Sequence, residues 1–170
     1  MSLCLCGKIN LSQRRKGAKK ELKLNLNEYI LGALNAITKE VITFTNLTYI
    51  NSISICALMD KLVALYVDLP IYLVLDNAKY QKNKFVKEYE SKLGIFLVYL
   101  PTYSPNLNLI ERLWRFIKKE ALYSTYYEDF SAFTNGIDLC LKDTKYKHKK
   151  KLNSLLSLNF QTFKNVRIKP

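Results

Sequence analysis

The sequence predicts an α/β protein in which buried strands alternate with helices. Two short apolar runs, Ile71–Leu75 and Ile95–Leu100, have the length and composition of strands buried on both faces. Residues 82–92, which lie between them, are amphipathic and stop at Gly94, as a helix would. A strand, a helix and a second strand in this order indicate a right-handed parallel crossover.

The neighbouring segments extend this pattern in both directions. Tyr29–Asn35 and Glu40–Thr45 are β-prone and flank a turn-like stretch, which predicts a hairpin. Apolar residues recur at intervals of three and four across Ile50–Tyr66, which predicts a helix facing a core. Two more helices are expected, from about Leu107 to Tyr123 and over Asp129–Lys142.

One domain accounts for most of the chain, because 170 residues suffice for a single hydrophobic core. Residues 1–28 show no sustained period and are interpreted as a poorly specified, basic N-terminal segment. The domain is expected to span residues 29–163, and residues 164–170 are interpreted as a C-terminal tail.

The chain is strongly basic, with 27 Lys and Arg against 14 Asp and Glu, and a formal net charge of +13. This balance favours a polyanionic partner such as nucleic acid, although the abundance of Lys, Asn, Ile and Tyr is also typical of an AT-rich genome. Two basic clusters are candidate nucleic-acid-binding sites, with solvated charged faces as the alternative. Their candidate residues are Arg14, Arg15, Lys16, Lys19, Lys20, Lys145, Lys147, Lys149, Lys150 and Lys151.

Membrane and secretory signals are missing from the sequence pattern. No apolar run approaches the roughly 18 residues of a membrane span, and the N-terminus lacks the pattern of a signal peptide. We therefore expect a cytoplasmic protein without a membrane partner. The four cysteines lack the spacing of a zinc site and are interpreted as reduced thiols.

Two carboxylates stand where the predicted elements would bring them together. Asp76 follows the first buried strand, and Glu111 falls in the first turn of a helix that begins after Pro101 and Pro105. Two acids facing each other favour a divalent metal site, because a cation offsets their repulsion. The structural alternative stays open, since a first-turn Glu stabilises a helix and Asp-Asn is a common turn.

The segments Leu73–Ala78 and Tyr99–Trp114 closely resemble the DDE transposases of bacterial insertion sequences in the mariner-like superfamily. The 34 residues between Asp76 and Glu111 (residues 77–110) equal the separation of the second and third catalytic acids in that group. The resemblance extends from about Tyr29 to Phe163.

This resemblance implies a ribonuclease H-like fold, in which a mixed sheet flanked by helices carries three acids and two Mg²⁺ or Mn²⁺ ions. By position, Asp76 and Glu111 would be catalytic residues and metal ligands, and Asn77 and the loop 103–108 would shape the crevice. The implied function is cut-and-paste DNA transposition, by metal-dependent strand cleavage and transfer. The implied partners are the terminal inverted repeats, the target duplex and a second copy in a homodimer.

The sequence departs from the family pattern at the first acid. Residues 1–28 offer only Glu21 and Glu28, and neither stands at a recognisable strand end. We interpret the domain as lacking its first strand, as in a truncated or frameshifted fragment completed by an upstream-frame product. The chain alone is then expected not to cleave or join DNA. The alternative is a catalytically inactive DNA-binding or interaction module derived from a transposase. Gln81 also stands where the family often has His.

Overall fold

The computed structural model describes residues 2–12, 27–102, 107–123 and 125–159. Its centre is a five-stranded sheet in the order β3-β2-β1-β4-β5. The β1–β2 and β2–β3 pairs are antiparallel, whereas β4 runs parallel to both β1 and β5, so the sheet is mixed. The strands are β1 (Ser2–Ser12), β2 (Asn27–Asn35), β3 (Val41–Asn46), β4 (Ile71–Leu75) and β5 (Ile95–Tyr99).

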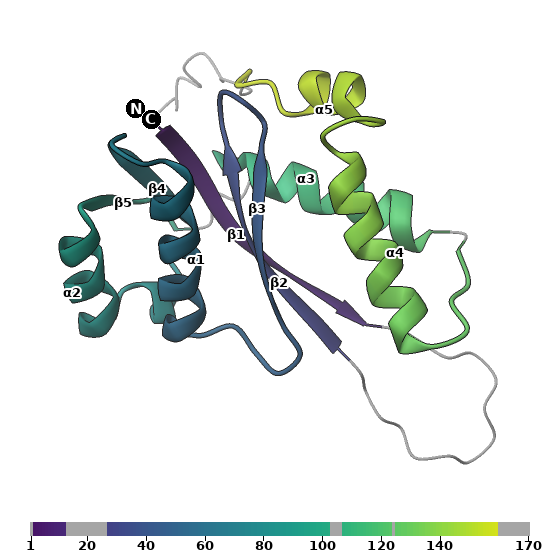
Figure 1. Ribbon diagram of the computed structural model, residues 1–170, viewed down its shortest axis with the longest axis horizontal. Helices are drawn as coiled ribbons and strands as arrows, with labels where there is room; N and C mark the ends of the chain where they lie inside the picture. Colours follow the sequence, from purple (N-terminus) through teal and green to yellow (C-terminus); the bar gives the residue numbers. More distant parts are fainter. Residues whose placement is uncertain (1, 13–26, 103–106, 124, 160–170) are drawn as a thin grey trace, which may run out of the picture.

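Helices cover both faces of the sheet (Figure 1). One face packs against the first two helices, and the other face packs against the last three. The helices are α1 (Ser52–Leu65), α2 (Lys84–Leu93), α3 (Leu109–Ile117), α4 (Phe130–Asp143) and α5 (Lys149–Leu155). Two short turns, the 3₁₀ turn η1 (Lys79–Gln81) and the π-helical turn η3 (Lys118–Leu122), follow β4 and α3.

The predicted hairpin and parallel crossover are both confirmed. The β2–β3 pair is the hairpin, and its register sets Leu34 opposite Val41. The β4–α2–β5 unit is the crossover, with β4 ending at Leu75 as the apolar run indicated. Gly94, with φ 65°, ends α2 in the left-handed conformation that glycine adopts without strain.

The first strand of the sheet is present, and the prediction that the domain lacks it is wrong. β1 lies at the centre, between β2 and β4. Its side chains alternate, so that Cys6 joins the core on the α1 face while Leu5 and Ile9 join the core under α3 and α4. Residues 2–12 are therefore a buried strand and not a poorly specified segment, whereas residues 13–26 lie outside the described part of the chain.

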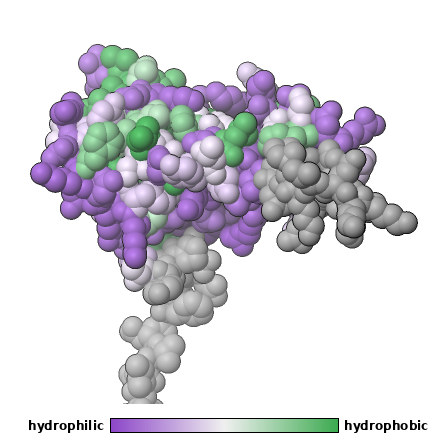
Figure 2. Space-filling model, turned by 90° about the horizontal axis from the view of Figure 1, so that it is seen from below, coloured by the Kyte–Doolittle hydropathy of each residue, from purple (hydrophilic) through white to green (hydrophobic). Residues whose placement is uncertain are grey.

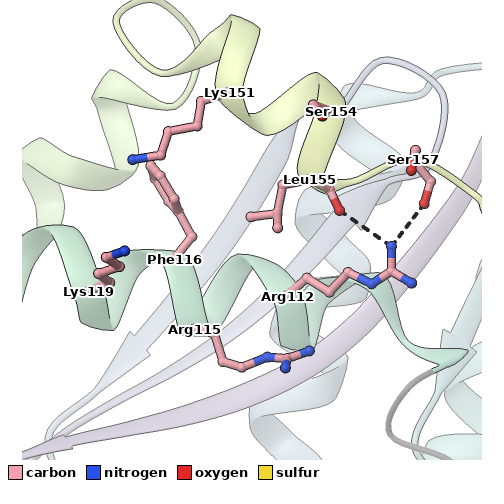
Figure 3. Close-up of a pocket in the computed structure, with 8 residues that line it drawn as sticks. All are labelled: Arg112, Arg115, Phe116, Lys119, Lys151, Ser154, Leu155 and Ser157. Atoms are coloured by element: carbon pink, nitrogen blue, oxygen red, sulfur yellow. Dashed lines mark hydrogen bonds between the residues drawn. The ribbon is translucent and has the colours of Figure 1, made fainter.

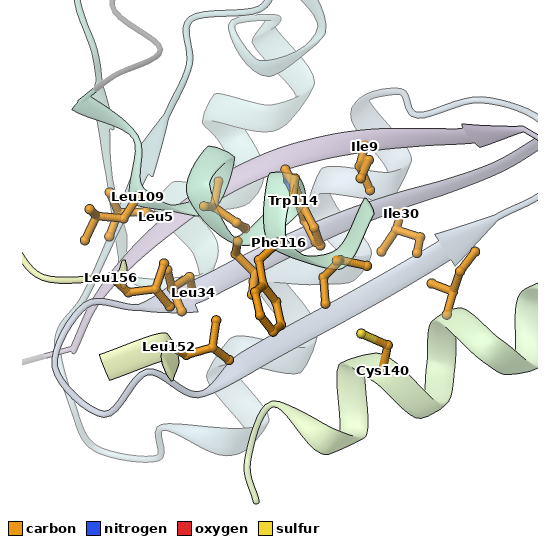
Figure 4. Packing of buried hydrophobic residues seen from close by; sticks show 14 of the residues in the cluster. Leu5, Ile9, Ile30, Leu34, Leu109, Trp114, Phe116, Cys140, Leu152 and Leu156 are labelled. Atoms are coloured by element: carbon orange, nitrogen blue, oxygen red, sulfur yellow. The ribbon is translucent and has the colours of Figure 1, made fainter. Parts of the chain in front are cut away.

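The core under α3 depends on aromatic packing against the central strands. Trp114 and Phe116 point from α3 into the space between the sheet and the C-terminal helices (Figure 4). Leu152 and Leu156, in and just after α5, close the same cluster. Burial of these large side chains fixes the position of α3 on the sheet, and therefore the position of every residue on that helix.

The surface combines polar areas with exposed hydrophobic side chains (Figure 2). Hydrophilic residues cover most of the face seen in Figure 2. No helix among the described residues has both the length and the apolar character needed to cross a membrane.

Glu28, in β2, is a carboxylate buried in this core. It lies opposite Leu11, with 2% of its surface exposed, and its Oε2 atom has no hydrogen-bond partner among the described residues. Burial raises the pKa of Glu28 from 4.5 to about 7, and the charge of Asp138 contributes in the same direction. A carboxyl whose pKa is raised on folding contributes stability below its unfolded pKa, and that stability is lost as the pH rises through the folded pKa.

We expect Glu28→Gln to stabilise the protein at pH 8 by roughly 1–2 kcal/mol, because the amide removes a buried charge whose cost follows from the raised pKa. Urea unfolding at pH 5 and pH 8 measures this difference. Glu88→Gln on α2 is the control, since Glu88 and its partner Lys84 are both exposed. The prediction is contradicted if the free energy of unfolding of wild type, compared with that of Glu28→Gln, does not fall from pH 5 to pH 8.

Candidate active site

Asp76 lies directly beyond the carboxyl end of β4, where its side chain is exposed. The chain then turns through Asn77, which has φ 74°. The Oδ1 atom of Asn77 is buried and has no hydrogen-bond partner among the described residues. Gln81 closes the turn, because its Oε1 accepts a hydrogen bond from the Ala78 amide at 2.9 Å. Gln81 is thus a buried structural residue at the position where the resemblance led us to look for His.

Glu111 is held in place by the start of α3. Asn108 caps the helix by accepting from the Ile110 amide, and its Nδ2 donates to the Cys6 carbonyl at 2.8 Å. This buried hydrogen bond joins residues 102 positions apart and ties the first turn of α3 to β1. Glu111 is half-buried in that turn, where the helix dipole favours a negative charge.

The charge of Asp76 acts on Glu111. Burial raises the pKa of Glu111, and the charge of Asp76 raises it further. Arg115 and Lys118 oppose this effect without reversing it. The structure therefore brings Asp76 and Glu111 within electrostatic range, at the end of β4 and the start of α3.

Gly7 of β1 stands beside both acids. The β1–β4 ladder pairs Leu5 with Val74, so Gly7 comes two residues further along, level with Asp76. A Cβ atom at Gly7 would lie 3.1 Å from Glu111 Oε1 and 3.4 Å from Trp114 Nε1. The Trp114 Nε1 donor is buried without a hydrogen-bond partner among the described residues. A carboxylate at position 7 would complete an acid triad and meet this donor, yet the residue is glycine.

The sequence indicated that the third acid is missing because the first strand is missing, but the structure shows a different cause. The strand is present, but it presents no carboxylate at this point. Glu28 lies four residues from Gly32, the partner of Gly7 in β2, or about 13 Å along the strand. It is too far to join the pair, and Glu21 lies outside the described residues. The sequence alone did not indicate that Gly7 lies at the site, because its place beside Asp76 depends on the pairing of β1 with β4.

Comparison with known proteins identifies the family. A family model described as DDE superfamily endonuclease matches residues 11–134, which is more than half of the chain. The chain belongs to the DDE superfamily endonucleases. The resemblance to this superfamily in the sequence is thereby confirmed. No curated protein matches the sequence.

Solved structures share the fold at low sequence identity. The catalytic core domain of BIV integrase has a TM-score of 0.60 and 16% identity, with 85% of this chain and 84% of that chain covered. The Mos1 mariner paired end complex with Mn has a TM-score of 0.65 and 11% identity, over 91% of this chain and 53% of that one. An intasome of simian T-cell lymphotropic virus, in complex with the PP2A regulatory subunit B56 gamma, has a TM-score of 0.63 and 12% identity. The match covers 99% of this chain and 56% of that chain. The chain spans about half the length of the last two. The ribonuclease H-like fold is confirmed by these likenesses.

The oxygen donors of this DDE endonuclease chain fit one hard cation. Asp76 and Glu111 offer carboxylates, and Asn77, which follows Asp76 in sequence, has an Oδ1 atom without a hydrogen-bond partner among the described residues. Within the described ranges, no three side chains from among His, Cys, Asp and Glu come together as a metal-binding group. The residues present therefore fit a single Mg²⁺ or Mn²⁺ and do not fit the pair of ions that an acid triad holds.

The predicted nucleic-acid-binding residues divide into two groups. The first cluster, Arg14 to Lys20, lies outside the described residues, as do Tyr103 to Asn106 of the loop. The second cluster is exposed in the turn between α4 and α5 and in the first residues of α5. Two of its lysines form ion pairs, Lys145 with Glu40 at 2.6 Å and Lys151 with Glu120 at 2.5 Å. Binding of nucleic acid by these residues stays a prediction.

We predict that Asp76→Asn lowers the pKa of Glu111, because the substitution removes the neighbouring negative charge. Carbon-detected NMR titration of the carboxyl groups measures this shift. Asp68→Asn is the matched control: Asp68 is exposed and has φ 59°, a conformation that Asn tolerates. An unchanged Glu111 titration in Asp76→Asn would mean that the two acids do not share a site.

Proposed function

We propose that the chain is a DNA-processing domain of the transposase type, which binds DNA and holds one divalent cation between Asp76 and Glu111. The observation that carries the proposal is that Asp76, just beyond β4, raises the pKa of Glu111 in the first turn of α3. Gly7, which is level with Asp76 in the sheet, lies beside Glu111 Oε1. Their separation of 34 residues (residues 77–110) and the family of the chain support the same assignment. The substrate class would be the phosphodiester backbone of DNA, in the terminal inverted repeats and target duplex of an insertion sequence.

Mg²⁺ or Mn²⁺ is the proposed cofactor. The Mos1 paired end complex was solved with Mn, and the HTLV-2 integrase catalytic core domain was solved in complex with magnesium. Both ions prefer the oxygen ligands that Asp76 and Glu111 provide. When bound at such a site, a divalent cation activates an attacking water or hydroxyl and stabilises a leaving oxygen.

The residues of this chain would hold the cation and expose it to DNA. Asp76 is exposed, so a ligand can reach it from solvent. Glu111 is half-buried, and the Asn108 bond to β1 fixes the backbone of the helix turn that carries it. Because burial raises its pKa, Glu111 takes up a proton more readily than a surface carboxyl when no cation is present.

Gly7 favours a second candidate function, a DNA-binding module without strand-cleavage activity. Because position 7, beside the two acids, is glycine, β1 provides no carboxylate that could bridge a second ion. We propose that the chain in its present sequence binds DNA but does not cut it. A homodimer and an upstream-frame product stay proposed partners. The sheet does not need the upstream product to supply β1.

We predict that wild-type protein binds Mn²⁺ weakly at a single site, and that Asp76→Asn and Glu111→Gln each weaken binding by about tenfold or more, as loss of a metal ligand does. Electron paramagnetic resonance of free Mn²⁺ measures the occupancy without any activity assay. Mn²⁺ binding by either variant that equals or exceeds that of wild type would exclude the substituted acid as a ligand.

A gain of function tests the role of Gly7 directly. A Cβ at Gly7 would lie 2.5 Å from Ile110 Cγ2, so Gly7→Asp needs room that Ile110→Leu provides by removing the methyl branch at Cβ. We expect the double variant to bind a second Mn²⁺ ion and Ile110→Leu alone to bind as wild type does. Unchanged Mn²⁺ stoichiometry in a folded double variant would show that position 7 does not complete the site.

We also predict that wild-type protein does not cleave a duplex carrying the terminal repeats of its element in Mg²⁺ or Mn²⁺. A strand-cleavage gel compares wild type, Glu111→Gln and the Gly7→Asp/Ile110→Leu variant. Metal-dependent cleavage by wild type that Glu111→Gln abolishes would reject the DNA-binding module and support an enzyme with two acids.

A further inference from the structure

A basic groove lies between α3 and α5, on the side of α3 that faces away from the sheet (Figure 3). Its cavity has a volume of about 750 Å³. Arg115 and Lys119 project from α3 and η3, and Lys151 projects from α5 across Phe116. The hydroxyl residues Ser154 and Ser157 line the opposite wall. None of the described residues that line the cavity is acidic.

Arg112 holds the groove in shape. Its Nη1 donates to the carbonyls of Ser157 at 3.1 Å and Leu155 at 3.4 Å, at the end of α5. These charge-assisted hydrogen bonds tie the two walls together, so the cavity does not need a ligand to form. Arg112 is therefore a structural residue of the groove.

The remaining cations lack enough local negative charge to balance them. Lys151 pairs with Glu120 and lies 5.0 Å from the centre of the Phe116 ring. Arg115 uses its Nε for a long hydrogen bond of 3.4 Å to the Glu111 carbonyl, and it forms no ion pair within the described residues. Lys119 is exposed. Three cations and two hydroxyls around one cavity match the chemistry of a phosphate group, which offers charge and several acceptor oxygens.

The position of the groove connects it with the acid pair. Glu111, Arg115 and Lys119 follow at intervals of four, so they lie along one side of the helix about 6 Å apart. We propose that the groove binds the phosphate backbone of a DNA strand that continues along α3 from Asp76 and Glu111. The identification of the polyanion as DNA rests on the proposed function, whereas the cavity and its charge do not.

The first test is equilibrium DNA binding at several salt concentrations. In EDTA, Arg115→Gln/Lys119→Gln should bind a fluorescent oligonucleotide about tenfold more weakly at low salt, and the slope of log K against log salt should fall by about two. The control is Lys87→Gln/Lys92→Gln on α2, which removes the same charge from exposed positions remote from the groove. An equal loss in this control would assign binding to overall charge and overturn the proposal.

A second measurement places the strand in the groove. The four native cysteines are buried, so Ser154→Cys introduces an accessible thiol that a photocrosslinking reagent can label. We expect the labelled Ser154→Cys protein to crosslink to DNA, and the labelled Ser91→Cys control on α2 not to do so. Crosslinking that is equal at both positions, or absent at position 154, contradicts the proposal.

Competition identifies the ligand and separates the two proposals. At constant ionic strength, millimolar inorganic phosphate should not displace the oligonucleotide from wild type, because a strand contacts several cations at once. Full displacement by phosphate, or groove-dependent binding of a phosphoserine peptide in place of DNA, would overturn the assignment. DNA binding in EDTA does not involve a cation at the acid pair, and Mn²⁺ binding is measured without DNA. Failure of one inference therefore leaves the other standing.

Discussion

The close seating of α3 on two paired glycines determines the rest of this structure. Gly7 of β1 and Gly32 of β2 are cross-strand partners, and a Cβ atom at Gly32 would lie 2.7 Å from the Trp114 ring. The absence of side chains at this pair lets Trp114 and Ile110 lie directly on the backbone of the sheet. The Asn108 bond to the Cys6 carbonyl then fixes the helix along its own axis. Because both constraints act on the start of α3, Glu111 lies within electrostatic range of Asp76.

The same seating explains why the acid set is incomplete. A side chain at position 7 would collide with the Ile110 methyl at 2.5 Å, in a core that is packed too closely to yield without cost. An aspartate there also needs a partner for its charge. The unpaired Trp114 Nε1 and a cation at Asp76 and Glu111 would supply one. In this chain, position 7 therefore allows α3 to pack closely on the sheet and provides no metal ligand.

The sequence predicted the elements whose signals are local. β4 is a run of five apolar residues that ends in Asp76, and α1 has a regular apolar stripe, so both were found with nearly correct ends. β1 was missed, because its first half is made of Cys, Leu and Gly, with no run of β-branched residues. Only its pairing with β2 and β4 makes it a strand, and that pairing joins residues far apart in the chain. The groove was not predicted for the same reason. Lys151 was a candidate nucleic-acid-binding residue, but Arg115 and Lys119 line a cavity with it only because α5 packs beside α3.

The acid pair can persist without a cation because its surroundings offset part of its repulsion. Glu111 lies in the first turn of α3, where the helix dipole stabilises a negative charge. The charges of Arg115 and Lys118 also lower its pKa, although burial and Asp76 outweigh them. Arg115 therefore has two roles, because its charge opposes the rise in the pKa of Glu111 and its side chain lines the basic groove.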